Sequence, residues 1–135
     1  MSAGTSSARS IQAPIAVGEL IDKITILEIK AERLRDPAKA QNVQTELALL
    51  RQIRTQAGLD IPDMAPFADE LRAINAILWE IEDEIRACEA EGDFGPRFVE
   101  LARSVYRTND RRSAVKKRIN LAFGSAIVEE KFYNI

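Results

Sequence analysis

The chain has 135 residues, of which 46% are hydrophobic and 30% are charged, and its formal net charge is -2. This length predicts one domain with its own core, and the small net charge gives no electrostatic reason to expect nucleic acid or an anionic membrane as a partner. The chain has no histidine and one cysteine, Cys88, which excludes imidazole-based catalysis, internal disulfides and cysteine-clustered zinc sites, so we expect no metal site and no cofactor.

The N-terminal residues differ from the rest of the chain. Residues 1–10 are small and polar and lack the apolar core of a secretory signal, so we predict a disordered tail there and a single helical domain over 11–135. Ile11 to Val17, around Pro14, is expected to be an extended arm. No run of about 20 apolar residues is present, so we predict no membrane span and a cytoplasmic location.

The first two helices are predicted to form an antiparallel hairpin. Gly18 opens the first helix, which continues to about residue 35 with apolar residues recurring every three or four positions. Asp36 is predicted to be the N-cap of a second helix, and Pro37 its first residue. Gly58 is predicted to end this helix. So short a link places the two helices side by side.

A longer pair of helices follows. Over 66–91 the apolar residues alternate at spacings of four and three, as in a coiled coil; they are Phe67, Leu71, Ile74, Leu78, Ile81, Ile85 and Cys88. A tight turn leads to a fourth helix over 96–123. Ser125 then caps a predicted last helical turn over 126–133 that docks Ile127, Phe132 and Tyr133. We therefore predict an all-α fold, an antiparallel bundle of two helix hairpins with four main helices and a short C-terminal helical turn.

The two long helices carry opposite charges. Residues 66–91 contain eight acids and two bases, and residues 96–123 contain eight bases and two acids. The row formed by Arg103, Arg107 and Arg111 is of the kind that binds phosphates. A simpler explanation is that this basic row pairs with the acidic helix, either within the chain or in a dimer. In addition, no aromatic residues alternate with the row, as they do in proteins that bind single-stranded nucleic acid. Both points argue against a nucleic-acid partner.

Polar residues interrupt the apolar face of the fourth helix. Continued from Phe98 and Val105, the pattern brings a group of polar residues inward before Ile119; they are Asn109, Arg112 and Lys116. Shifting the frame to Thr108 and Val115 still leaves Arg112 inside. A buried guanidinium needs an anionic partner. On the third helix a stripe of Asn75, Trp79, Glu82 and Arg86 offers one, so we predict that Arg112 pairs with Glu82.

Three interpretations of this polar group remain open. A buried Arg–Glu pair can fix the register of the helices. A polar pocket inside the bundle can instead receive a small anionic ligand. Its candidate residues would be Arg112, Lys116, Asn109, Glu82 and Trp79. In the third interpretation the fourth helix is rotated and Arg112 extends outward to solvent.

Three blocks of the sequence resemble one protein family. They are Gly18 to Asp36, Leu78 to Arg86, and Leu101 to Asn120 together with residues 124–133. Together they resemble a bacterial family of unknown function, DUF6165. The resemblance implies a small all-helical domain and supplies no activity, ligand or catalytic residue. In that family a hydroxyl residue is often found where this chain has Ala16, so we expect the first helix to lack a side-chain cap there.

A second similarity is to the helical chorismate mutases, whose opening helix resembles residues 70–86. The chain lacks a nucleophile–base pair, a metal cluster and a phosphate loop at usable spacing. We therefore expect a non-catalytic interaction or scaffold module that self-associates as a dimer and can have another protein as partner. The alternative is a small-anion-binding protein, or an enzyme that acts through Arg, Lys, Glu and Asn. The identity of a ligand or protein partner stays open.

Overall fold

The structure, a computed structural model, describes residues 8–131, and these contain helices and no strands. The four long helices are α1 (Val17–Arg33), α2 (Pro37–Gln56), α3 (Ala65–Glu91) and α4 (Pro96–Ala122), and a short 3-10 turn, η2 (Pro62–Met64), precedes α3. This confirms the predicted all-α fold with four main helices. The helix ends lie within a few residues of the predicted ones because local signals set them. Asp36, for example, accepts hydrogen bonds from the backbone N–H groups of Ala38 and Lys39 at 2.9 and 3.3 Å.

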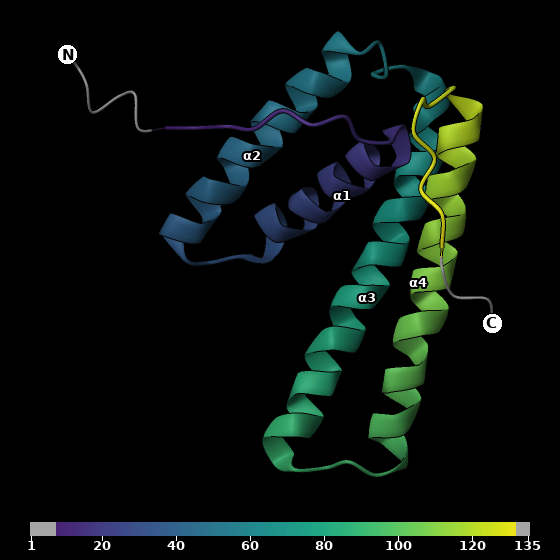
Figure 1. The fold of residues 1–135 in the computed structure, drawn as a ribbon. Helices are drawn as coiled ribbons and strands as arrows, with labels where there is room; N and C mark the ends of the chain where they lie inside the picture. The colour runs from purple at the N-terminus through teal and green to yellow at the C-terminus, as the bar shows by residue number, and fades with distance from the viewer. Residues whose placement is uncertain (1–7, 132–135) are drawn as a thin grey trace.

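The helices form two hairpins of unequal length (Figure 1). The first consists of α1 and α2, and the second of the longer α3 and α4. Helix α1 packs against α2, α3 and α4, whereas α2 packs against α1 alone. Figure 1 shows that the far halves of α3 and α4, near the turn that joins them, extend well past α1 and α2. The first hairpin therefore covers only one end of the second.

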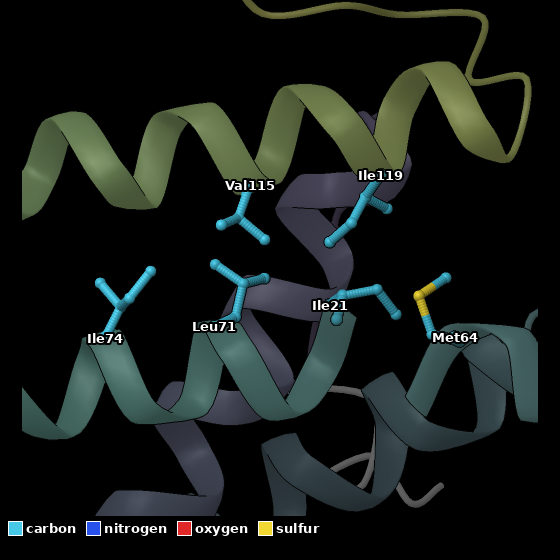
Figure 2. Close-up of a cluster of buried hydrophobic side chains, with 6 residues drawn as sticks. All are labelled: Ile21, Met64, Leu71, Ile74, Val115 and Ile119. Atoms are coloured by element: carbon cyan, nitrogen blue, oxygen red, sulfur yellow. The ribbon is translucent and has the colours of Figure 1, made fainter. Parts of the chain in front are cut away.

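Two apolar clusters hold the hairpins together, and α1 contributes to both. The first joins α1, η2, α3 and α4 and is shown in Figure 2; its buried members are Ile21, Met64, Leu71, Ile74, Val115 and Ile119. The second fills the α1–α2 hairpin with Leu20, Ile24, Leu27, Val43 and Leu47. Burying one such side chain is worth about 1.5–3 kcal/mol. Removing α1 would expose both clusters, so α1 is the central element of the fold.

The burial pattern along α4 shows which face of this helix is turned toward the core. Thr108, Val115 and Ile119 are buried, and Arg112 lies on the same line, one turn from each of its neighbours. Asn109 and Lys116 are half-buried beside this line. The frame through Thr108 and Val115 is therefore the correct one, and Arg112 points inward as predicted.

The predicted C-terminal helical turn is wrong over the part that the structure describes. Residues 126–131 contain no helix, and Ile127 is exposed instead of docked. The segment follows α4 in an extended conformation because three ion pairs attach it to that helix: Lys116–Glu129, Lys117–Glu130 and Lys131–Asp110. Phe132 and Tyr133 lie outside the described residues, as do residues 1–7 of the predicted tail. Residues 8–16 contain no helix, as predicted for the arm before α1.

Candidate functional site

A buried ion pair joins α1 to α4 at the centre of the polar residues. Asp22, on α1, is fully buried, and Arg112 reaches it from α4. Arg112 Nε donates to both carboxylate oxygens of Asp22, at 3.0 and 3.1 Å, and Nη2 also donates to Oδ2. A guanidinium that bonds a carboxylate through two nitrogens fixes both the distance and the orientation of the two groups. The pair therefore fixes the position of α1 on the α3–α4 hairpin.

The predicted partner of Arg112 was wrong. Glu82 pairs with Arg86, one turn along the same helix, at 3.3 Å, where the Arg86 side chain is largely exposed and that of Glu82 is partly exposed. The carboxylate that Arg112 meets comes from α1 because α1 crosses the α3–α4 hairpin at the level of Arg112. Asp22 and Thr25 interrupt the apolar face of α1 three residues apart, and this was the available sequence signal for a polar contact there.

Two neutral side chains complete the surroundings of Asp22. Asn75, on α3, donates through Nδ2 to Asp22 Oδ1 at 2.9 Å and to Thr25 Oγ1 at 3.0 Å. Thr25 Oγ1 donates to the backbone carbonyl of Asp22 at 2.8 Å. No buried side-chain nitrogen or oxygen in residues 8–131 lacks a hydrogen-bond partner. The network thus joins three helices without leaving a buried polar atom unpaired, which would be costly.

Lys116 forms a second set of ion pairs one turn from Arg112. Its Nζ lies 2.6 Å from Glu19 Oε2, 2.9 Å from Glu129 Oε1 and 3.9 Å from Asp22 Oδ2. Burial lowers the pKa of Lys116, but the hydrogen bonds to Glu19 and Glu129 outweigh it, and the pKa is raised overall. The hydrogen bond to Asp22 likewise raises the pKa of Arg112. Because the pKa of Lys116 is higher in the folded protein than in the unfolded chain, its ion pairs stabilise the fold. This stabilisation is complete below the lysine pKa of the unfolded chain, about 10.4, and is lost only as the pH rises through the pKa of the folded protein. Lys116 and Arg112 therefore both carry their positive charge at neutral pH.

The N-terminus of α1 is capped by side chains from the other end of the chain. Ala16 provides no side-chain cap, as expected. Instead Val17 N–H donates to Ser125 Oγ at 3.0 Å, and Gly18 N–H donates to Asn120 Oδ1 at 2.7 Å. Two backbone donors that a helix leaves unpaired are thereby satisfied. The partners are more than 100 residues away in sequence, so no local pattern pointed to them.

Two depressions in the surface lie next to the Asp22–Arg112 ion pair, and some of the predicted site residues line one of them and some the other. A cleft of about 300 Å³ lies between α1 and α3, with Trp79, Glu82 and Arg112 among its lining residues. A larger groove of about 990 Å³ runs between α4 and residues 129–131, and Asn109, Lys116 and Arg112 line it. Arg112 therefore separates the two, and the five predicted residues do not line a single pocket.

Comparison with known proteins places the chain in a family. The sequence model of the family of unknown function DUF6165 matches residues 11–135. The chain belongs to this family. No curated protein matches the DUF6165 chain, and no solved structure matches it.

The charged groups of this DUF6165 site are mostly occupied with one another. Asp22, Arg112, Lys116 and Glu19 all form ion pairs that bring helices together. Within residues 8–131 no three His, Cys, Asp or Glu side chains lie together as metal ligands would. In the same range no helix is both long enough and apolar enough to cross a membrane. The arrangement therefore supports a role of the ion pairs in positioning α1.

Proposed function

We propose that this DUF6165 chain is a non-catalytic interaction module that acts as a homodimer, and that the free halves of α3 and α4 form the interface. The observation that carries the proposal is the extension of this hairpin past α1 and α2 (Figure 1). The last ion pair between α1 and α3 joins Arg33 to Glu80 at 2.5 Å. From there to the turn, α3 and α4 have only each other as helical neighbours.

The free half of the hairpin exposes large apolar side chains. Phe94 in the turn and Val99 and Tyr106 on α4 are each about half exposed. Val99 and Tyr106 are seven residues apart and therefore lie on the same side of the helix, with the small, exposed Ala102 between them. Large apolar side chains that are exposed together on one side of a helix are typical of a docking surface.

Charge favours a second copy of the chain as the occupant. Two ion pairs join α3 to α4 directly, Arg97–Glu84 at 3.6 Å and Arg118–Glu70 at 3.2 Å. Within residues 8–131, the free half of the hairpin also exposes acids on α3 that have no ion-pair partner and bases on α4 that pair only within α4: Glu89 and Glu91, and Arg103 and Arg107. A two-fold axis places α4 of each copy against α3 of the other, so that basic and acidic surfaces meet twice.

Light scattering on a size-exclusion column tests this proposal. At tens of micromolar the wild-type chain should have twice the 15.1 kDa mass of one chain. Val99→Glu should shift the protein to the monomer because a charge would be buried in the interface. Leu49→Glu, on α2, is a matched control since Leu49 and Val99 are both 52% exposed, and it should remain dimeric. A wild-type monomer, or a Val99→Glu variant as dimeric as Leu49→Glu, would contradict the proposal.

A further inference from the structure

We propose that the cleft between α1 and α3 binds a small monocarboxylate with an apolar body, such as a medium-chain fatty acid, with Lys30 facing its carboxylate. The cleft begins beside the Asp22–Arg112 pair and extends along α3 to Asp83 and Arg86, at the edge of the half of the hairpin that we assign to the dimer interface. The proposed ligand contacts residues of one chain only, so octanoate binding and dimerisation are measured separately and each can fail without the other.

The walls of the cleft suit an apolar ligand body. Ile26 and Ile29 of α1 face Leu78 and Trp79 of α3 across it. The volume of about 300 Å³ is at the small end of natural ligand pockets. Since a water molecule occupies about 30 Å³ in the liquid, this space holds a ligand of roughly ten non-hydrogen atoms. A straight-chain carboxylate of medium length has that size.

The charges around the cleft favour a single negative charge on the ligand. Within residues 8–131, Lys30 has no carboxylate within ion-pair distance. Its ammonium group can therefore donate to the carboxylate of a ligand. Glu82 and Asp83 also line the cleft, and their repulsion grows with each negative charge on the ligand, which disfavours a phosphate dianion relative to a monocarboxylate.

Trp79 is held in place before any ligand arrives. The guanidinium of Arg33 lies over its ring, 5.6 Å from the centroid, and Arg33 is itself fixed by Glu80. A ring that is already ordered loses little conformational entropy when a ligand packs against it. Trp79 is also the single tryptophan of the chain, so its fluorescence reports on this cleft alone.

The test is a titration of the full-length chain with octanoate, followed by tryptophan fluorescence. We expect a saturable change at concentrations up to millimolar. Octanamide, which has the same apolar body and no charge, should bind about tenfold more weakly or worse, because hydrogen bonds to a charged group are the stronger ones. A signal that does not saturate, or equal binding of octanamide and octanoate, would overturn the proposal.

Two lysine variants test the role of Lys30. Lys30→Gln should weaken octanoate binding by about tenfold or more, since a charge-assisted hydrogen bond is lost. Lys39→Gln removes an exposed lysine of α2 that does not line the cleft, and this variant should bind octanoate like the wild type. Thermal melting of both variants shows whether they remain folded. If Lys30→Gln melts like the wild type and binds octanoate as tightly, the cleft does not use this residue and the assignment fails.

Discussion

Asp22→Ala should lower the free energy of unfolding by about 3 kcal/mol or more, measured by urea denaturation. The substitution leaves Arg112 and Lys116 directed at a site without its carboxylate, and the buried Asn75 amide loses one of its acceptors. Removing one member of a buried ion pair is costly because the remaining charge has lost its solvent as well as its partner.

Glu82→Ala is the matched control for this prediction. Glu82 was the carboxylate that the sequence favoured as the partner of Arg112, but it forms an exposed pair with Arg86 instead. Its loss should change the free energy of unfolding by less than about 1 kcal/mol, as for other surface ion pairs. If Glu82→Ala were more destabilising than Asp22→Ala, Glu82 and not Asp22 would be the partner of Arg112.

Gly18→Ala should destabilise the protein by about 2 kcal/mol, within the range found when a packed interior receives an extra methyl group. A Cβ atom at this position would lie 2.5 Å from the backbone oxygen of Lys116 and 3.0 Å from Asn120 Oδ1. The backbone of α4 cannot move aside without separating the two helices and breaking the bond from Gly18 N–H to Asn120.

The sign of the Gly18→Ala effect is the informative result. Helix propensity alone predicts stabilisation by about 1 kcal/mol, because alanine is the better helix former. A thermal melt that shows a higher midpoint for Gly18→Ala would mean that α1 and α4 are not in such close contact. A lower midpoint supports the contact.

The helices were predictable from the sequence because their ends depend on residues next to them. Asp36 and Pro37 start α2, and Gly92 ends α3 with the positive φ of 69° that glycine adopts without strain. Arg112 was also predictable as an inward residue, since the apolar line of α4 breaks at it and resumes afterwards. In each case a pattern within one helix was sufficient.

The partners in the site were not predictable in the same way, because they depend on where α1 crosses the other helices. Asp22 and Arg112 are 90 residues apart in sequence. Because α3 is rich in acidic residues and directly precedes α4 in the chain, the sequence favoured Glu82 of α3 as the partner of Arg112. Gly18 had the appearance of a helix start, and its role in close helix contact depends on α4. Residues 126–131 lack a helix because their charges pair with α4.

A double-mutant cycle on Asp22 and Arg112 measures most directly whether the buried ion pair anchors α1. We expect Asp22→Leu and Arg112→Met each to cost about 3 kcal/mol, because each leaves a charge without its partner. The double variant should be within about 1 kcal/mol of the wild type, since a packed apolar pair can replace a buried ion pair. This gives a coupling energy well above the error of about 0.5 kcal/mol expected for independent sites. If instead the two costs simply add, Asp22 and Arg112 act independently, and their ion pair does not hold α1 on the α3–α4 hairpin.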